Sequence, residues 1–300
     1  MKLTIYFFSM QYGKVPSQTA NRNFLFTIFT PVYNGEKTIY RVFSSLKESK
    51  YRNFEWIVIN DGSTDRSDEI IKGLILTVDW DITYLNEEKN SGKHILWNHA
   101  ARIAKGDIFI TLDCDDSFVP EALDFLNEKW NEYYDDKLVY GIDTLCSDPE
   151  TEEINGTLFP YDGIKSCYDE LYNRYGVRGE KWNSFRTEYM KECPFPEISC
   201  NYYTECYLLY SLGEKYRTVG FNKVLRHYYQ EPHSLMHLRK IKISHLYMVI
   251  HYQRWHLKKM GGHLLFANPK EFYRCTHELC RTFVIYLFMR IIRAKEIVRY

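Results

Sequence analysis

The sequence lacks any apolar run long enough to cross a bilayer. A membrane-spanning helix needs roughly 20 apolar residues, and the longest clean run, residues 283–289, ends at Arg290. The first 23 residues have only one charge, Lys2, before an apolar stretch, and they lack the small-residue cleavage site of a signal peptide. We therefore expect an N-terminal tail over residues 1–23 and a cytoplasmic protein.

Three other absences exclude functional classes. None of the 8 cysteines forms a CxxC pair, which favours free thiols over a zinc site or a disulfide framework. The turn after the first apolar run, PVYNGE, has one glycine, so the GxGxxG turn of a dinucleotide oxidoreductase is missing. Lys plus Arg equals Asp plus Glu, 39 each, so no general positive charge indicates nucleic acid as a partner.

The zero net charge conceals an uneven distribution. Residues 236–300 contain 13 Lys or Arg against 3 acidic residues, and the first 235 residues carry a balance of −10. This difference predicts two regions with different partners. We expect one domain over residues 24–235 and a basic, mostly helical C-terminal extension over residues 236–300.

Short apolar runs alternate with helical patterns between residues 24 and 143. Such repeated βα units predict an α/β fold with a mainly parallel sheet flanked by helices. Later, residues 144–200 look loop-rich, residues 202–213 look helical, and residues 219–229 resemble an edge strand. The expected strands are residues 24–30, 54–60, 81–86, 108–112 and 138–143, with helices after the first four.

The run Asp113-Cys114-Asp115-Asp116 directly follows an apolar strand. Two carboxylates about 5 Å apart repel by roughly 3 kcal/mol at an effective dielectric constant of about 20. A cation among them would remove that cost, and oxygen ligands favour Mg²⁺ or Mn²⁺. The alternative interpretation is a solvated acidic turn before the helix that begins near Pro120.

Two more polar clusters follow strands or open helices. Asp61 directly follows the second predicted strand, ahead of a Gly-Ser-Thr turn that would also serve as an ordinary helix cap. Lys93 follows Gly92 at a helix start, where backbone N–H groups can hold phosphate. In parallel sheets, ligands bind beyond the carboxyl ends of the strands, which is where these clusters lie.

Together these motifs resemble the nucleotide-sugar domain of family 2 glycosyltransferases, which adopt the Rossmann-like GT-A fold. The segments that carry the resemblance are FTIFTPVYNGEKTI, FEWIVINDGSTDRS and NSGKHILWNHAARIAKGDIFITLDCDDSF. A weaker similarity to bacterial enzymes of surface-polysaccharide synthesis continues through residues 179–216. The last 60 residues carry no such match.

The resemblance implies a role for individual residues. The acceptor hydroxyl would be deprotonated by Glu205, with Glu197 and Glu180 as rivals, because the aspartate that often follows this acid is a cysteine here. Metal ligands would be Asp115 and Asp113, with His233 as a further candidate from a downstream segment. The expected nucleotide-binding residues are Thr30, Pro31, Val32, Tyr33, Glu36, Asp61, Lys93 and Asp113.

The implied reaction is metal-dependent, inverting transfer from a nucleotide-diphosphate sugar, expected to be a UDP-sugar, to a glycan or lipid-linked acceptor. A second carboxylate placed for glycoside hydrolysis is not evident. The alternative function is a non-catalytic sugar-binding protein of the same fold.

The C-terminal extension offers a further partner. Apolar residues recur at helical spacing over residues 272–293 with arginines around them. A helix packed on the catalytic domain is one interpretation, and peripheral contact with an anionic membrane at the inner face of the cell membrane is another. A homodimer contact is the third. The residues on the apolar face are Phe272, Cys275, Leu279, Phe283, Tyr286 and Leu287.

Overall fold

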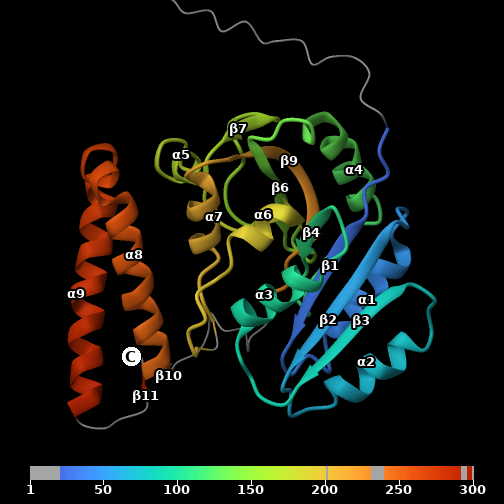
Figure 1. Ribbon diagram of the computed structural model, residues 1–300, viewed down its shortest axis with the longest axis horizontal. Helices are drawn as coiled ribbons and strands as arrows, with labels where there is room; N and C mark the ends of the chain where they lie inside the picture. The colour runs from blue at the N-terminus through green and yellow to red at the C-terminus, as the bar shows by residue number, and fades with distance from the viewer. Residues whose placement is uncertain (1–20, 201, 231–239, 292–295, 299–300) are drawn as a thin grey trace, which may run out of the picture.

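The computed structural model describes residues 21–200, 202–230, 240–291 and 296–298 (Figure 1). Four parallel strands form the first half of its main sheet. β1 (Phe26–Val32) lies between β2 (Phe54–Asp61) and β4 (Ile108–Thr111), and β3 (Asp81–Glu87) pairs with the outer side of β2. These are the first four strands that the sequence predicts.

Helices cover both faces of this half-sheet, because successive strand residues point to opposite faces and both sets are apolar. Ile28 belongs to one core cluster and its neighbour Phe29 to the other. The first face is covered by α1 (Ile39–Glu48), α2 (Ser67–Ile75) and α4 (Ala122–Tyr133). The second is covered by α3 (Lys93–Ile103), α6 (Thr187–Glu192) and α7 (Cys206–Gly213).

The second half of the sheet is mixed. β8 (Lys181–Arg186) runs antiparallel between β4 and β6 (Val139–Ser147), and β9 (Arg217–His227) is parallel to β6. In the described part of the chain, six of the nine strands of this sheet run in one direction, so the predicted mainly parallel α/β fold is confirmed.

Two details of the prediction are wrong. The segment expected as an edge strand is β9, which lies inside the sheet because short antiparallel strands pair with it on the side away from β6. These are β5 (Ser117–Phe118) and β7 (Ile164–Ser166). The segment expected as loop-rich contains α5 (Tyr168–Asn173) and β8. Pairing on both sides buries four of the six residues of β8.

Two long helices of the C-terminal region confirm its helical character. They are α8 (Ile243–Ala267) and α9 (Pro269–Ile291), which pack on each other and follow β10 (Lys240–Lys242); β11 (Glu296–Val298) pairs with β10. α8 contacts α7 through Trp255, whose ring lies 4.6 Å from that of Tyr207, while α9 lies on the far side of α8 (Figure 1). No helix among the described residues is both long and apolar enough to cross a membrane.

Candidate active site

The carboxyl ends of β1, β2 and β4 meet at one edge of the sheet, because these strands are parallel neighbours. Asp61 is the last residue of β2, and Asp113 comes two residues after β4. The structure therefore brings together the three polar clusters that the sequence singles out.

The loop after β1 is tied to the loop after β2. Asn34 adopts a left-handed conformation, with φ of 54°, and its side-chain oxygen accepts a hydrogen bond of 2.8 Å from the backbone N–H of Thr64. The carboxylate of Glu36 accepts another, of 3.1 Å, from the N–H of Arg66. Glu36 thus satisfies a backbone donor at the start of α2 in addition to any contact with a nucleotide.

The other residues expected to bind the nucleotide after β1 differ in exposure. Thr30 and Val32 are fully buried, and the hydroxyl of Thr30 accepts a hydrogen bond of 3.0 Å from the indole N–H of Trp56. Tyr33 is 48% exposed, and Pro31 is partly exposed. Of this set, Tyr33 offers the largest accessible surface to a flat ring.

Asp61 fixes the loop that precedes α3. Its two carboxylate oxygens accept hydrogen bonds from the backbone N–H groups of Ser91, at 2.7 Å, and Gly92, at 3.0 Å. Burial raises the pKa of Asp61, and these two hydrogen bonds oppose the rise. Each oxygen keeps a further lone pair for a ligand donor.

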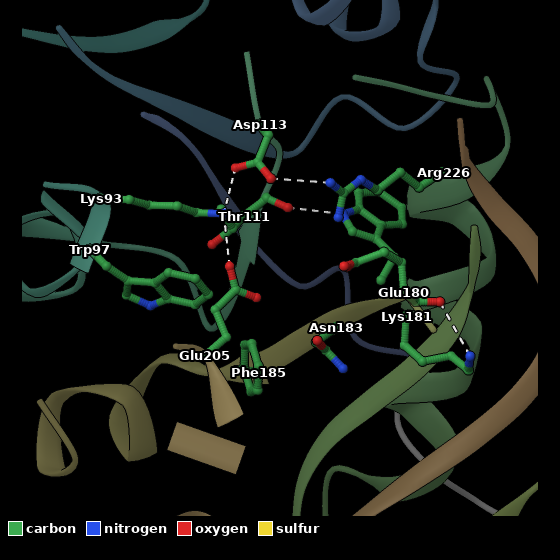
Figure 2. Close-up of a pocket in the computed structure, with 11 residues that line it drawn as sticks. Lys93, Trp97, Thr111, Asp113, Glu180, Lys181, Asn183, Phe185, Glu205 and Arg226 are labelled. Carbon is green, nitrogen blue, oxygen red and sulfur yellow. Dashed lines mark hydrogen bonds and ion pairs between the residues drawn. The ribbon is translucent and has the colours of Figure 1, made fainter. Parts of the chain in front are cut away.

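Lys93, the first residue of α3, lies between two acids that are far apart in sequence. Its ammonium nitrogen is 2.6 Å from Asp113 Oδ1 and 2.8 Å from Glu205 Oε1, as Figure 2 shows. Burial alone would lower the pKa of Lys93, but the two carboxylates outweigh burial and raise it well above its usual value. Lys93, Asp113 and Glu205 therefore share one pocket of about 20 Å³, whereas Asp115 is not among the residues that line it.

Glu205 is positioned by the segment that leads into α7. The helix predicted over residues 202–213 begins only at Cys206, and Glu205 directly precedes it without forming a side-chain capping hydrogen bond. Of the two rivals, Glu180 lines the same pocket, whereas Glu197 is exposed and is not among the residues lining it. Glu180 is exposed at the rim of this pocket, and its pKa is raised, first by partial desolvation of the carboxylate and then by the nearby charge of Glu205.

Arg226, in β9, is a site residue that the sequence reasoning did not select. Its buried guanidinium donates to Asp113 Oδ2 at 3.1 Å and, through Nε, to Asp116 Oδ2 at 2.8 Å. Lys93 and Arg226 together keep the pKa of Asp113 below its ordinary value, although burial alone would raise it. Its strand reads RTVGFNKVLRH and contains Arg217, Lys223 and His227 as well, so the sequence pattern did not single out Arg226.

Asp115 is the carboxylate of this run that forms no ion pair within the described residues, although the guanidinium of Arg41 donates to its backbone carbonyl at 2.8 Å. Burial, then the charges of Asp113 and Asp116, raise its pKa to about 7. A bound cation would relieve that repulsion. No group of three or more possible ligand side chains occurs in the described residues. The two carboxylates of Asp113 and Asp115 nevertheless suit Mg²⁺ or Mn²⁺, because proteins bind these ions through one or two carboxylates plus substrate phosphates. His233 lies outside the described residues.

The sequence profile of the family described as "Glycosyl transferase family 2" matches residues 27–193, more than half of the chain. The chain belongs to this family.

Two bacterial relatives match parts of the chain. The teichoic acid poly(glycerol phosphate) polymerase of Staphylococcus epidermidis is 33% identical over 105 residues, which are 35% of this chain and 15% of the polymerase. Glycosyltransferase GlyA of Streptococcus pneumoniae is 34% identical over 165 residues, which are 55% of this chain and 22% of GlyA. The chain thus spans less than a quarter of either relative.

Two solved structures share the fold, which is GT-A. Staphylococcus aureus TarS (residues 1–349 of that protein), in complex with UDP-GlcNAc, superposes with a TM-score of 0.60 at 18% identity, covering 86% of this chain and 71% of TarS. The mannosyltransferase PcManGT from Pyrobaculum calidifontis, in complex with GDP-Man and Mn²⁺, gives a TM-score of 0.55 at 17% identity, covering 86% and 75%.

Proposed function

We propose that this protein is an inverting, metal-dependent glycosyltransferase that moves a sugar from a nucleotide-diphosphate sugar to an acceptor hydroxyl. The observation that carries the proposal is the meeting of Lys93, Asp113 and Glu205 in one pocket at the carboxyl edge of the sheet. The similarity to a teichoic acid polymerase supports a place in bacterial surface-polysaccharide synthesis. UDP-GlcNAc, bound by a structural neighbour, is the first donor to test.

Different parts of the chain have different roles in the proposed reaction. Residues 24–235 are the catalytic domain and residues 236–300 the extension. Tyr33 and Asp61 contact the base, and Lys93 contacts the diphosphate when it turns from its acidic partners. Asp115, with Asp113, would hold Mn²⁺ or Mg²⁺, which when bound would supply positive charge to the departing diphosphate.

The transfer itself needs one base. The carboxylate of Glu205 takes the proton of the acceptor hydroxyl, whose oxygen forms a bond to the anomeric carbon. The bond from that carbon to the phosphate oxygen breaks, and the nucleoside diphosphate leaves with the electron pair. Attack opposite the leaving group inverts the anomeric configuration.

Replacing three glutamates by glutamine tests the assignment of the base. We expect Glu205→Gln to slow UDP release from UDP-GlcNAc by about 100-fold or more, with UDP affinity in calorimetry changed only a few-fold. Glu197→Gln, an exposed control, keeps full turnover. If Glu180→Gln loses turnover and Glu205→Gln does not, Glu180 is the base. A wild-type chain that binds the nucleotide sugar without turnover would favour the non-catalytic alternative.

A second feature supports contact with an anionic membrane. Phe283, Leu287 and Phe288 on the outer face of α9 are 44–58% exposed, and Arg281 and Arg290 flank them. The predicted apolar face of residues 272–293 is thus only partly buried, since Cys275 is buried and Phe283 is exposed. Residues 279–295 include no acid, and each basic residue at an anionic surface contributes about 1 kcal/mol.

Vesicle flotation tests this contact. We expect the protein to float with phosphatidylglycerol vesicles and not with phosphatidylcholine vesicles, and high salt to weaken the binding. Phe288→Asp should abolish flotation, whereas Leu76→Asp, an exposed apolar position in the catalytic domain, should not. Equal behaviour with both vesicle types contradicts the contact, and a dimer that Phe288→Asp dissociates would assign the face to a second copy.

A further inference from the structure

A second cavity lies between the catalytic domain and the C-terminal helices. It has a volume of about 240 Å³ and is lined by residues of α5, α7, α8 and α9. At about 30 Å³ per water molecule, it has room for about eight of them, so it also accommodates one sugar ring. We call it the hairpin cavity, because α8 and α9, two consecutive helices packed on each other, form one side of it.

The hairpin cavity contains polar atoms that the chain leaves without partners. Gln253 and His256, on α8, are 4% and 2% exposed, and both line the cavity. Among the described residues, neither Gln253 Oε1 nor His256 Nδ1 has a hydrogen-bond partner. A buried polar group without a partner is costly. Neither atom is accessible to water in this structure, so a ligand in the cavity would supply the missing hydrogen bonds after the two side chains turn toward it.

The rest of the lining defines the chemistry of that ligand. Gln253 Oε1 is an acceptor and requires an O–H or N–H donor, because the amide nitrogen already donates to Glu278 at 2.6 Å. Burial lowers the pKa of His256, so the imidazole is neutral at pH 7. Flat aromatic surfaces, which suit the C–H face of a sugar ring, come from Tyr168, Tyr172, Tyr210 and Tyr252.

The charges of the lining exclude an anionic occupant. Glu271 and Glu278 outnumber Arg274, whose guanidinium is already paired with Glu271 at 2.5 Å. A phosphate group entering the cavity would meet net negative charge and no unpaired cation among the described lining residues. The donor's diphosphate and a phosphate-bearing acceptor unit are therefore both unsuited to it.

The hairpin cavity adjoins the pocket of the proposed base. Thr204 and Cys206 line the hairpin cavity, and Glu205 between them lines the pocket that holds Lys93. Neighbouring Cα atoms along a chain are about 3.8 Å apart, so one short segment separates the two spaces. We propose that the hairpin cavity binds a neutral sugar unit of the acceptor, and thereby presents the next hydroxyl of that acceptor to Glu205. This inference rests on the proposed function for the identity of the ligand.

Saturation-transfer NMR tests the site with defined probes. The probes are the methyl glycosides of glucose, galactose and N-acetylglucosamine at millimolar concentration, with glycerol 1-phosphate as the anionic comparison. We expect at least one glycoside to bind and glycerol 1-phosphate not to bind. His256→Phe and Gln253→Met should each weaken binding by about fivefold or more, the effect of one lost buried hydrogen bond. His277→Phe, an exposed histidine on α9, should bind like the wild type.

Failure of this inference is distinguishable from failure of the proposed function. If UDP-GlcNAc turns over but no glycoside binds, or if binding is unchanged in both cavity variants, the sugar site is refuted alone. Preference for glycerol 1-phosphate refutes the neutral assignment. Glycoside binding that the cavity variants abolish, in a chain that neither binds nor cleaves a nucleotide sugar, keeps the site and refutes the transferase. Circular dichroism confirms that the variants are folded.

Discussion

Replacing Arg226 by methionine should strongly destabilise the fold, because it leaves a buried carboxylate without its partner. Asp116 is 1% exposed, and Arg226 donates to it through both Nε and Nη2. Breaking a buried ion pair by removing one partner costs about 3 to 5 kcal/mol. For a urea m-value of about 3 kcal/mol/M, the unfolding midpoint should fall by about 1 to 2 M.

A double variant isolates the contribution of the Arg226–Asp116 ion pair. In Arg226→Met with Asp116→Asn, no unpaired charge remains at this position, and we expect the double variant to recover about 2 kcal/mol of the loss. Arg66→Met, which removes an exposed ion pair to Glu69, should leave the midpoint unchanged.

The effect of Arg226→Met should also depend on pH. Burial already raises the pKa of Asp116, and Arg226 opposes that rise. Without the guanidinium the pKa rises further above the unfolded value of about 3.9. The protonated form is compatible with burial, so the variant approaches wild-type stability at low pH and loses it as pH rises through the native pKa. A midpoint shift corresponding to less than about 1 kcal/mol at pH 7, or no recovery in the double variant, would refute this reasoning.

Three other substitutions have defined outcomes. Gly62→Ala should lower the free energy of unfolding, measured by urea titration, by about 1 to 3 kcal/mol, because φ is +65° and an added Cβ would lie 2.7 Å from the Lys89 carbonyl carbon. Burial raises the pKa of Asp143 to about 6, so ionisation of this carboxyl in the folded protein lowers the free energy of unfolding. The unfolding free energy of the wild type should therefore fall relative to Asp143→Asn by roughly 2 to 3 kcal/mol from pH 4 to pH 7. Lys93→Met should weaken UDP binding, measured by calorimetry, by about tenfold or more, whereas Lys105→Met, at an exposed ion pair, should not.

The parallel half of the sheet could be predicted because each strand is a local apolar run bounded by turn residues. β2, for example, reads FEWIVIND and is buried throughout. The meeting of Asp61 and Asp113 at one edge followed from the parallel arrangement alone. These parts of the site depend on short-range pattern and on one general rule of topology.

The remaining parts depend on contacts between distant segments. β8 reads KWNSFR, which is not an apolar run, and its central place rests on a buried arginine, Arg186, that donates to the carbonyl of Val139 at 2.6 Å. The partnership of Arg226 with Asp116 spans 110 residues. The hairpin cavity needs four helices to assemble before Gln253 and His256 share a space. No periodicity or spacing in the sequence encodes these pairings.

The most direct test of the transferase assignment is UDP release from UDP-GlcNAc, followed with and without Mn²⁺. We expect metal-dependent release by the wild type, loss of that dependence and of most release in Asp115→Asn, and wild-type behaviour in Asp79→Asn, an exposed aspartate of the same domain. A parallel assay with GDP-mannose shows whether the donor is another nucleotide sugar. Release that is equal with and without Mn²⁺, or unchanged in Asp115→Asn, would contradict the account.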